Sequence, residues 1–520
     1  MRLGAIDVGS NSVHLVVADV GPDGRIEVID RVKEMVRLGR RTFTTGRLEP
    51  RAMDLTVRAV TTFARLARAR RVQRLRAVAT SAVREARNGA AFVRRLRRET
   101  GLAVRIISGA EEARLIFRAA RHALGLSGGP HLLVDVGGGS VELVLVQDGH
   151  PLWLRSVPLG VARLSERFLP ADPPRAGQVR RLERHLARTI GPLLADARRA
   201  GVVDAIGTSG TVNTLVAMAR AARGEDAGRL HGTTVTAADI ARLRRRVLAA
   251  DAGQRGELPG MDTKRVDLMP AAVVLVDFVL REAGARELAA CGWALREGVL
   301  LDLAGLGRGR APDAAVARRR RVEALATRFA GANTHGQQVA RLATALFDAT
   351  AAALRLPPAA RELLEYAALL HDIGHAIDHD RHHRHSCYLI RNADLVGFDA
   401  LEVEILAQVA RGHRKQMPKV VDPELHALPA PARRIVRGCA ALLRLADALD
   451  RTHFGVVRAV AAVVTAGRVR IDVDAGGDNP ELEMWAAERR LDLLTRLLER
   501  PVSVRVRRRS SARPRLRVAT

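Results

Sequence analysis

The sequence has few aromatic residues, few cysteines and no long apolar run, and each shortage excludes a class of function. Aromatic residues make up 3% of the 520 residues, which leaves few platforms for stacking nucleic-acid bases, so no specific nucleic-acid partner is expected. The three cysteines form no CxxC pair and predict a reducing, cytoplasmic location without disulfides. The longest apolar stretch, 271–280, is interrupted by Asp277, and the N-terminus lacks the apolar core of a signal peptide, so no membrane association is expected.

Lysine is also rare, although the chain is strongly basic. Lysine and arginine together number 85, of which four are lysine, and the formal net charge is +29. An arginine excess of this size favours polyanionic partners such as polyphosphate, nucleotides or nucleic acid. A composition rich in alanine and arginine is equally typical of a GC-rich genome, which would explain the charge without a function. Both explanations stay open at this point.

The stretch 132–145, LLVDVGGGSVELVL, has the pattern of two strands joined by a tight glycine turn. Glycines let the backbone approach a ligand closely, and their N–H groups can form a nest for an anion. Asp135 and Glu142 are carboxylates within apolar strands, where a charge is costly unless it has a partner. A glycine turn between two acids suits a phosphate and the metal ion that neutralises it.

A second copy of this pattern lies near the N-terminus. Residues 7–17 read DVGSNSVHLVV, and residues 135–145 read DVGGGSVELVL, so seven positions coincide without a gap. We interpret the match as an internal duplication, which would place two phosphate-binding turns across one cleft. The alternative is two unrelated hairpins of similar composition.

The segment between the two copies contains further candidates. A strand over 75–80 leads into Arg84, which would lie at a strand end where a ligand cleft forms. A strand over 103–107 is followed by SGAEEARLIF, in which Ser108 or Gly109 can cap a helix opening with Glu111 and Glu112. Two acids in a first turn are explained by the helix dipole alone, and equally by a general base that activates water.

Later motifs and boundaries complete the organisation. A strand over 202–206 leads into GTSGTVNTL, a glycine turn at a helix start that suits an anion. After a Gly/Pro/Arg linker over 305–313, the pattern becomes almost wholly helical, and the last segment ends in a basic tail that is either disordered or a polyanion contact. We expect a duplicated α/β fold followed by a helical domain, with divisions at 1–128, 129–304, 315–465 and 466–520.

Together these motifs resemble the exopolyphosphatase / guanosine pentaphosphate phosphohydrolase family, whose catalytic part has the actin-like fold of sugar kinases and Hsp70. They are AIDVGSNSVHLVV, VATSAVREARN, IISGAEEARLIF, LLVDVGGGSVELVL, AIGTSGT and ALREGVL, in the family's order. The resemblance implies that Glu112 is the catalytic base, that Asp135 and Glu142 hold Mg²⁺, and that a homodimer forms. It implies phosphate binding by Asp7, Gly9, Ser10, Asn11, Ser12, Arg84, Gly137, Gly138, Gly139, Ser140, Gly207, Ser209, Gly210 and Thr211.

The helical domain resembles the HD phosphohydrolase superfamily. His371 and Asp372 lie in YAALLHDIGH, with His335 upstream and Asp447 downstream, which is the H…HD…D set of that superfamily. Imidazole and carboxylate ligands of this kind suit a divalent metal, and the histidines at 382, 383, 385 and 413 could contact phosphate or a second metal. The alternative is an inactive polar cluster within the core.

The resemblance implies hydrolysis of the terminal phosphate of inorganic polyphosphate, with Mg²⁺ as cofactor. The nearest rival is a 5′-phosphohydrolase acting on guanosine pentaphosphate (pppGpp), because the same turns would serve it. A regulator that binds nucleotide or polyphosphate without turnover, and hydrolysis by the HD-type domain instead, are two further alternatives.

Overall fold

The computed structural model describes residues 1–21, 26–126, 128–225, 230–306, 314–393, 395, 397–414 and 423–507. The chain divides into two compact units, Met1–Ala314 and Ala315–Thr520. Among the described residues, no helix combines the length and the apolarity needed to cross a bilayer.

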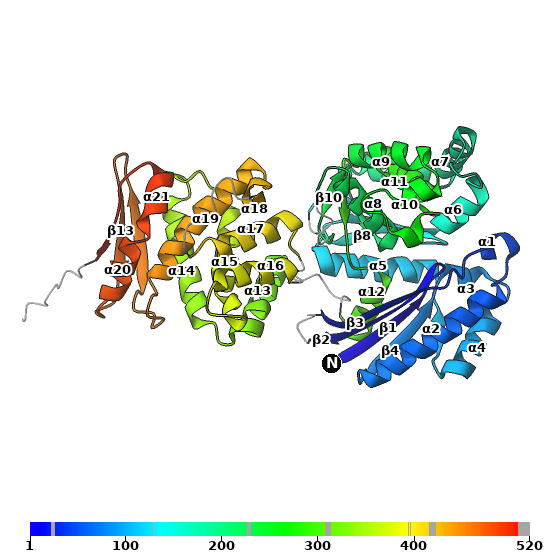
Figure 1. The fold of residues 1–520 in the computed structure, drawn as a ribbon, viewed down its shortest axis with the longest axis horizontal. Coiled ribbons are helices and arrows are strands. Elements are labelled where there is room, and N and C mark those ends of the chain that lie inside the picture. Colours follow the sequence, from blue (N-terminus) through cyan, green and yellow to red (C-terminus); the bar gives the residue numbers. More distant parts are fainter. Residues whose placement is uncertain are drawn as a thin grey trace, which may run out of the picture. The chain divides into compact units, whose positions relative to one another are not determined.

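The first unit begins with a five-stranded sheet in the order β3-β2-β1-β4-β5. Its strands are β1 (Arg2–Val8), β2 (Ser12–Val20), β3 (Ile26–Met35), β4 (Arg74–Ala79) and β5 (Val104–Ile106). Helix α2 (Pro50–Ala69) packs on β1 and β2, and α4 (Gly89–Thr100) packs on α2 and β5, so these helices form a layer against the sheet (Figure 1). The short helices α1 (Thr42–Thr45) and α3 (Ser81–Glu85) follow strand ends.

The second half of this unit repeats the same strand order. Its sheet runs β10-β11-β9-β6-β7-β8, so the order from β8 to β11 matches that from β3 to β5, with β10 added at the edge. The strands are β6 (His131–Val136), β7 (Val141–Gln147), β8 (His150–Val157), β9 (Asp204–Thr208), β10 (Thr234–Thr236) and β11 (Glu287–Ala290). The accompanying helices are α6 (Val161–Phe168), α7 (Ala176–Arg199), α8 (Ser209–Ala221), α9 (Ala237–Ala249), α10 (Ala252–Gly256) and α11 (Met269–Ala283).

The two glycine hairpins share their register as well as their place in the sheet. Asp7 pairs with His14 across the first hairpin, and Asp135 pairs with Glu142 across the second. Each turn is closed by the same hydrogen bond: Gly9 N–H donates to the Ser12 carbonyl at 3.1 Å, and the equivalent N–H of the second turn donates to Ser140, also at 3.1 Å. The predicted duplication is therefore visible in topology, register and turn geometry.

Two helices, α5 (Gly109–Leu124) and α12 (Leu295–Leu303), lie between the two sheets (Figure 1). Helix α5 packs on β7 and β8, α12 packs on β1, and the two helices cross closely. A side chain at Gly298 would place its Cβ 2.1 Å from the Leu115 carbonyl oxygen, so this crossing requires glycine. Asp302 on α12 accepts from Arg76 of β4 at 2.5 Å and from Arg118 of α5 at 2.8 Å, which ties the two helices to each other and to the first sheet.

The second unit is mainly helical and ends in a small sheet. Its core is one cluster that includes Leu442 of the helices together with Ile471 and Leu494 of the C-terminal segment. The predicted helix over 482–498 is divided at residues 489–490, and the basic tail from residue 508 onward lies outside the described residues. The elements are α13 (Ala314–Ala330), α14 (Thr334–Thr350), α15 (Ala360–Leu370), α16 (His382–Asn392), α17 (Ala400–Arg411), α18 (Pro423–His426), α19 (Ala430–Ala448), β12 (Ala459–Val464), β13 (Val469–Asp474), α20 (Glu481–Glu488), α21 (Leu491–Leu498) and β14 (Val502–Val506).

Gly160, at the start of α6, tests how tightly the central glycine turn of the first unit is packed. A Cβ there would lie 2.2 Å from the Gly139 nitrogen, so Gly160→Ala must displace the central glycine turn. We expect Gly160→Ala to lower the free energy of unfolding by about 1–3 kcal/mol, the usual cost of overpacking. In the control Gly191→Ala, on α7, the added methyl meets nothing within 4 Å, and it should stabilise the helix by up to about 1 kcal/mol. Urea unfolding of both variants measures the difference, and equal stabilities would contradict the tight packing.

Candidate active site

A cleft of about 220 Å³ lies between the two halves of the first unit and is lined by all three predicted glycine turns. The sequence places these turns far apart in the chain, and the fold brings them to one cavity because each follows a strand near the middle of its sheet. The predicted residues that line it are Asp7, Gly9, Ser10, Asn11, Ser12, Glu112, Asp135, Gly137, Gly138, Gly139, Ser140, Ser209, Gly210 and Thr211.

The two hairpin turns face each other at close range. A Cβ on Gly138 would lie 3.3 Å from the Ser10 Cβ, and a Cβ on Gly139 would lie 2.8 Å from the Ser10 Oγ. A side chain at Gly139 would displace Ser10, so this glycine lets the two turns approach closely, with their backbone N–H groups and the hydroxyl of Ser10. Such a concentration of donors can hold the oxygens of a phosphate.

Carboxylates form the acidic side of the cleft. Asp7, Glu112 and Asp135 line it, and Glu142, the cross-strand neighbour of Asp135, is enclosed beside it with 1% of its surface exposed. Burial raises the pKa of Asp7 to about 7, of Asp135 to about 6 and of Glu112 to about 7, and it raises the pKa of Glu142 well above its ordinary value. Burial therefore outweighs the attraction of the nearby arginines, Arg84 for Glu112 and Arg296 for Asp7 and Asp135.

The hydrogen bonds of the acids leave room for a cation. The Oδ1 of Asp135 accepts from the Thr208 hydroxyl, and the Oε1 of Glu142 accepts from Ser156 at 2.7 Å. Asp7 Oδ1 and Glu142 Oε2 are buried and have no hydrogen-bond partner. Oxygen ligands with uncompensated charge are what Mg²⁺ prefers, so the donor set fits that ion.

The structure places Arg84 against Glu112 and outside the lining of the main cleft. Its Nη1 donates to Glu112 Oε2 at 2.9 Å and to the Ile107 carbonyl at 3.0 Å. The pair fixes the Glu112 carboxylate, and the attraction of Arg84 partly offsets the rise that burial causes in the pKa of Glu112. Arg84 also borders a neighbouring hollow of about 550 Å³ together with Arg155 and Ser156. Its predicted phosphate contact stays a prediction.

Glu111 and Gly207 also have clear places. Ser108 caps α5 and accepts from the Glu111 N–H at 3.2 Å, while the Glu111 carboxylate pairs with Arg105. Gly207 lies within β9, and a Cβ there would lie 2.3 Å from Val212. Glycine at this position therefore lets Val212 pack closely against the end of the strand that precedes the turn. The two adjacent glutamates thus face different surroundings, and Glu112 is the one that reaches the cleft.

Sequence reasoning missed the basic side of the cleft, which consists of Lys33, Arg265 and Arg296. Arg296 Nη1 donates to His14 Nδ1 at 3.0 Å, and burial together with Arg296 lowers the pKa of His14 to about 2, so this ring stays neutral. Arg265 Nη1 donates to the Thr211 hydroxyl at 3.2 Å. Arg296 lies within the motif ALREGVL and Lys33 is one of four lysines, and these were the signals available in the sequence.

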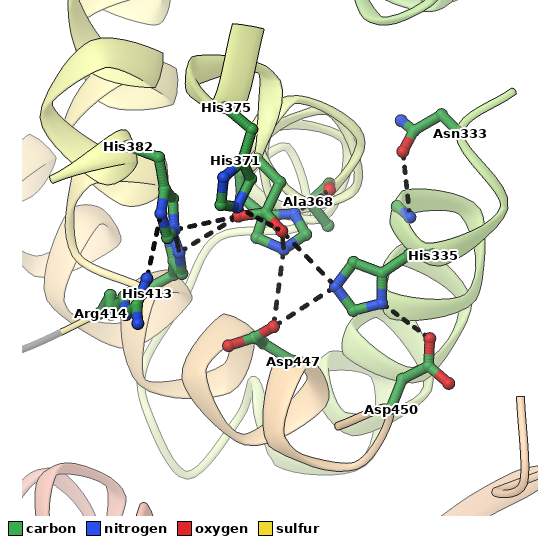
Figure 2. A network of polar contacts seen from close by, with 12 residues as sticks. Asn333, His335, Ala368, His371, His375, His382, His413, Arg414, Asp447 and Asp450 are labelled. Atoms are coloured by element: carbon green, nitrogen blue, oxygen red, sulfur yellow. Dashed lines mark hydrogen bonds and ion pairs between the residues drawn. The ribbon is translucent and has the colours of Figure 1, made fainter. Parts of the chain in front are cut away.

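In the second unit the four predicted HD-type residues meet, and Figure 2 labels His335, His371 and Asp447. His335 Nε2 lies 3.4 Å from Asp447 Oδ1 and 3.8 Å from Asp372 Oδ2. His371 Nε2 lies 3.6 Å from the same two carboxylate oxygens. The set comes from α14, the end of α15 and α19, so three separate helices build it.

A duplicated α/β unit whose glycine turns surround carboxylates and arginines defines a protein that binds phosphate groups. Comparison with protein families then gives the particular group. Residues 16–306 match the Ppx/GppA phosphatase family, and residues 317–473 match Ppx/GppA phosphatase, domain III. The chain belongs to the Ppx/GppA phosphatase family and is a hydrolase of phosphoanhydride bonds.

Two relatives and one solved structure show the extent of the similarity. Exopolyphosphatase 1 of Mycobacterium leprae is 35% identical over 302 residues, which cover 58% of this chain and 89% of that protein. Guanosine-5'-triphosphate,3'-diphosphate pyrophosphatase of Vibrio vulnificus is 31% identical over 451 residues, 86% of each chain. The crystal structure of an exopolyphosphatase from Cytophaga hutchinsonii is 30% identical with a TM-score of 0.56, covering 59% of this chain and 99% of that one.

The raised pKa of Asp135 predicts a pH-dependent stability. In metal-free protein Asp135 stays protonated up to about pH 6, whereas in the unfolded chain it ionises near its ordinary value of 3.8. Between these values the free energy of unfolding should fall by about 1.4 kcal/mol per pH unit, and Asp135→Asn removes that loss. The advantage of the variant over the wild type should therefore grow from pH 4 to 6 and then level off.

Chemical unfolding in a chelating buffer at pH 4, 5, 6 and 7 measures this difference. Asp148→Asn is the control, because Asp148 is exposed in a hairpin turn at φ 51°, which asparagine also tolerates. A stability difference between Asp135→Asn and the wild type that stays constant over this range would contradict the assignment.

Proposed function

We propose that the protein is an exopolyphosphatase that removes terminal orthophosphate from inorganic polyphosphate with Mg²⁺ as cofactor. The observation that carries the proposal is the Glu112 carboxylate, which Arg84 holds at the wall of a cleft lined by two opposed glycine turns. The proposed fold class is the duplicated actin-like one, since both sheets of the first unit have the same strand order.

The glycine turns would bind the terminal phosphoryl group. The turns line the cleft from both halves, and a rigid set of backbone N–H and hydroxyl donors would cost little reorganisation during the reaction. The phosphate-binding set that we propose is Asp7, Gly9, Ser10, Asn11, Ser12, Gly137, Gly138, Gly139, Ser140, Ser209, Gly210 and Thr211, with Gly207 and Arg84 in support.

Asp135 and Glu142 would hold Mg²⁺, and the unpartnered Oδ1 of Asp7 would face the same charge. The ion supplies positive charge that offsets the phosphate oxygens. Asp135 lines the cleft and Glu142 is enclosed directly beside it. Burial raises the pKa of both carboxyl groups, and an ion bound there would stabilise their charged forms.

Glu112 would act as the general base. Its pKa of about 7 lies near neutral pH, where a base is most effective. The carboxylate takes a proton from a water molecule whose oxygen forms a bond to the terminal phosphorus. The bridging P–O bond breaks, and its electron pair leaves with the shortened polyphosphate. Positioning and charge compensation supply the remaining catalysis, and no protein nucleophile is required.

The basic side of the cleft suits the rest of the polyphosphate chain. Lys33, Arg265 and Asn213 line both the cleft and an adjoining hollow of about 380 Å³, so two cationic groups border the space next to the cleft. Asp262 lines the hollow as well and pairs with Arg265 at 3.1 Å. Burial and the nearby Arg265 lower the pKa of Lys33. A run of anionic phosphates would relieve this repulsion.

The second candidate is a 5′-phosphohydrolase acting on pppGpp, since the Vibrio vulnificus relative named for that substrate covers 86% of this chain. A regulator that binds its ligand without turnover is the third candidate. Arg84 holds the Glu112 carboxylate at the wall of the cleft, as expected for a catalytic base, and this argues against a regulator. Localisation in the cytoplasm and a homodimer also remain predictions.

Replacing the base tests catalysis directly. Glu112→Gln keeps the size of the side chain but cannot accept a proton, so phosphate release from long polyphosphate should fall by about 10²–10⁴-fold. The control is Glu111→Gln, the preceding residue in the same helical turn, whose carboxylate pairs with Arg105 and whose loss should leave the rate little changed. Equal rates for Glu112→Gln and the wild type would rule out the assignment of Glu112.

The substrate is tested by measuring phosphate release from long polyphosphate and from pppGpp side by side, with Mg²⁺. We expect turnover of polyphosphate, because Lys33 and Arg265 line both the cleft and the hollow that adjoins it. Arg265→Met should raise KM for polyphosphate more than it lowers kcat, since this side chain lines the adjoining hollow and Glu112 does not. Activity on pppGpp alone would overturn the first choice of substrate.

A further inference from the structure

Ser12, His14 and Arg296 form a chain of hydrogen bonds, and all three residues line the cleft. Arg296 Nη1 lies 3.0 Å from His14 Nδ1, and His14 Nε2 lies 2.7 Å from the Ser12 Oγ. Arg296 belongs to α12, whereas the other two residues belong to β2 of the first hairpin. The chain therefore connects a helix to the first phosphate turn, over 282 positions of the sequence.

Strand pairing fixes the place of the His14 ring. His14 pairs with Asp7 of β1 on one side and with Lys33 of β3 on the other. Directly opposed residues of neighbouring strands point to the same face of a sheet, so these three side chains form one row along the cleft, which all of them line. Both ring nitrogens are engaged by residues outside this row, namely Arg296 and Ser12.

The direction of each hydrogen bond follows from the first donor. A guanidinium donates and never accepts, so His14 Nδ1 accepts from Arg296 and carries no hydrogen. The ring is neutral, because burial and the charge of Arg296 lower its pKa to about 2. Its one N–H hydrogen is therefore on Nε2, which donates to the Ser12 hydroxyl oxygen. The hydroxyl keeps its own hydrogen for a different acceptor.

The tautomer of His14 decides what Ser12 presents to the cleft. A hydroxyl that already accepts one hydrogen bond donates a stronger one, so Ser12 suits a phosphate oxygen. With the hydrogen on Nδ1 instead, Ser12 would donate to the ring and turn its lone pairs toward the phosphate oxygens, which would be repelled. Arg296 excludes that tautomer by occupying Nδ1 as a donor.

The second hairpin uses its equivalent serine in the opposite direction. Ser140 has the position of Ser12 in the turn, and Glu142 has that of His14 in the strand pairing. Burial raises the pKa of Glu142, and the hydroxyl groups of Ser156 and Ser140 oppose that rise. A carboxylate only accepts, so a hydroxyl stabilises it by turning its hydrogen toward it. The first turn thus offers a hydroxyl hydrogen to an anion, and the second leaves a hydroxyl oxygen for a cation.

We propose that Arg296 and His14 are positioning residues that fix the Ser12 hydroxyl as a hydrogen-bond donor to the terminal phosphoryl group. Both act through Ser12 and need not touch the reacting atoms. This role rests on the proposed hydrolysis of polyphosphate, in which Ser12 is one of the phosphate-binding residues. A donor that the protein has already oriented meets the charge on the phosphoryl oxygens without reorganisation during the reaction.

The first measurement reads the tautomer without turnover. In the full chain labelled with ¹⁵N-histidine, two-bond ¹H–¹⁵N correlation spectra show which ring nitrogen carries the hydrogen, and His14→Gln identifies the signals of His14. We expect hydrogen on Nε2 alone at pH 7. Arg296→Met should let the hydrogen populate Nδ1, whereas Arg296→Lys should not, because an ammonium group also only donates.

Arg31→Met is the matched control for the spectra, since Arg31 pairs at 3.3 Å with Glu297, the neighbour of Arg296 in the same helix. It should leave the His14 tautomer unchanged. Hydrogen on Nδ1 in the wild type, or a tautomer that Arg296→Met does not alter, would overturn the proposal.

A double-mutant cycle tests whether His14 acts through Ser12. With polyphosphate and Mg²⁺, Ser12→Ala should lower kcat by about 10²-fold, the lower end of the loss for one oriented donor. His14→Leu should lower kcat by about 10-fold, as expected for one hydrogen bond, and His14→Gln should lose less because it keeps an N–H group. The double variant of Ser12→Ala with His14→Leu should match Ser12→Ala within about twofold. A loss equal to the product of the two single losses would overturn the proposal.

The readouts separate this proposal from the proposed function. A wild-type protein that releases no phosphate from polyphosphate would contradict the function, while the spectra still decide the hydrogen-bond chain. The cycle is then measured as affinity for inorganic triphosphate, with the same expectation for the double variant. Circular dichroism verifies that each variant is folded, and His14→Met replaces His14→Leu if the leucine variant does not fold.

Discussion

The structure depends on the crowding of four carboxylates in one buried cleft. Asp7, Glu112, Asp135 and Glu142 come from different strands and helices, and burial raises the pKa of each one. Such an arrangement is costly unless a cation and its anionic ligand enter together. The basic side chains of the cleft in turn need an anion to offset their charge. The proposed occupant of the cleft, a multiply charged phosphate with its metal ion, would supply both kinds of counter-charge.

The duplication explains how the cleft became asymmetric. Both hairpins keep the strand-turn-strand geometry and its closing hydrogen bond, yet the position of Glu142 is occupied by His14 in the first half. Burial and the nearby Arg296 keep the histidine neutral, whereas the glutamate adds to the acidic group around Asp135. In the proposed mechanism one half therefore supplies the metal ligands and the other adjoins the cationic side.

The sequence was informative where function depends on local pattern. The repeated Asp-Val-Gly turn predicted the duplication, and the resemblance of the helical domain to the HD superfamily predicted that His335 and Asp447 would meet. Long-range partners were not predictable in this way: Arg296 reaches His14 across 282 positions, and the support of His335 by Asp450 depends on how two helices pack. Arg84 shows the same limit, because no local pattern indicates that it pairs with Glu112. Its position after a strand predicted a place near the cleft but not its partner.

The central claim is that water attacks the terminal phosphorus of the substrate. Hydrolysis of inorganic triphosphate in ¹⁸O-labelled water tests this most directly, because the products, orthophosphate and diphosphate, report which phosphorus was attacked. The account predicts one solvent oxygen in the orthophosphate and none in the diphosphate formed in the first turnover. Label in the diphosphate instead would show attack at the inner phosphorus and would contradict the account.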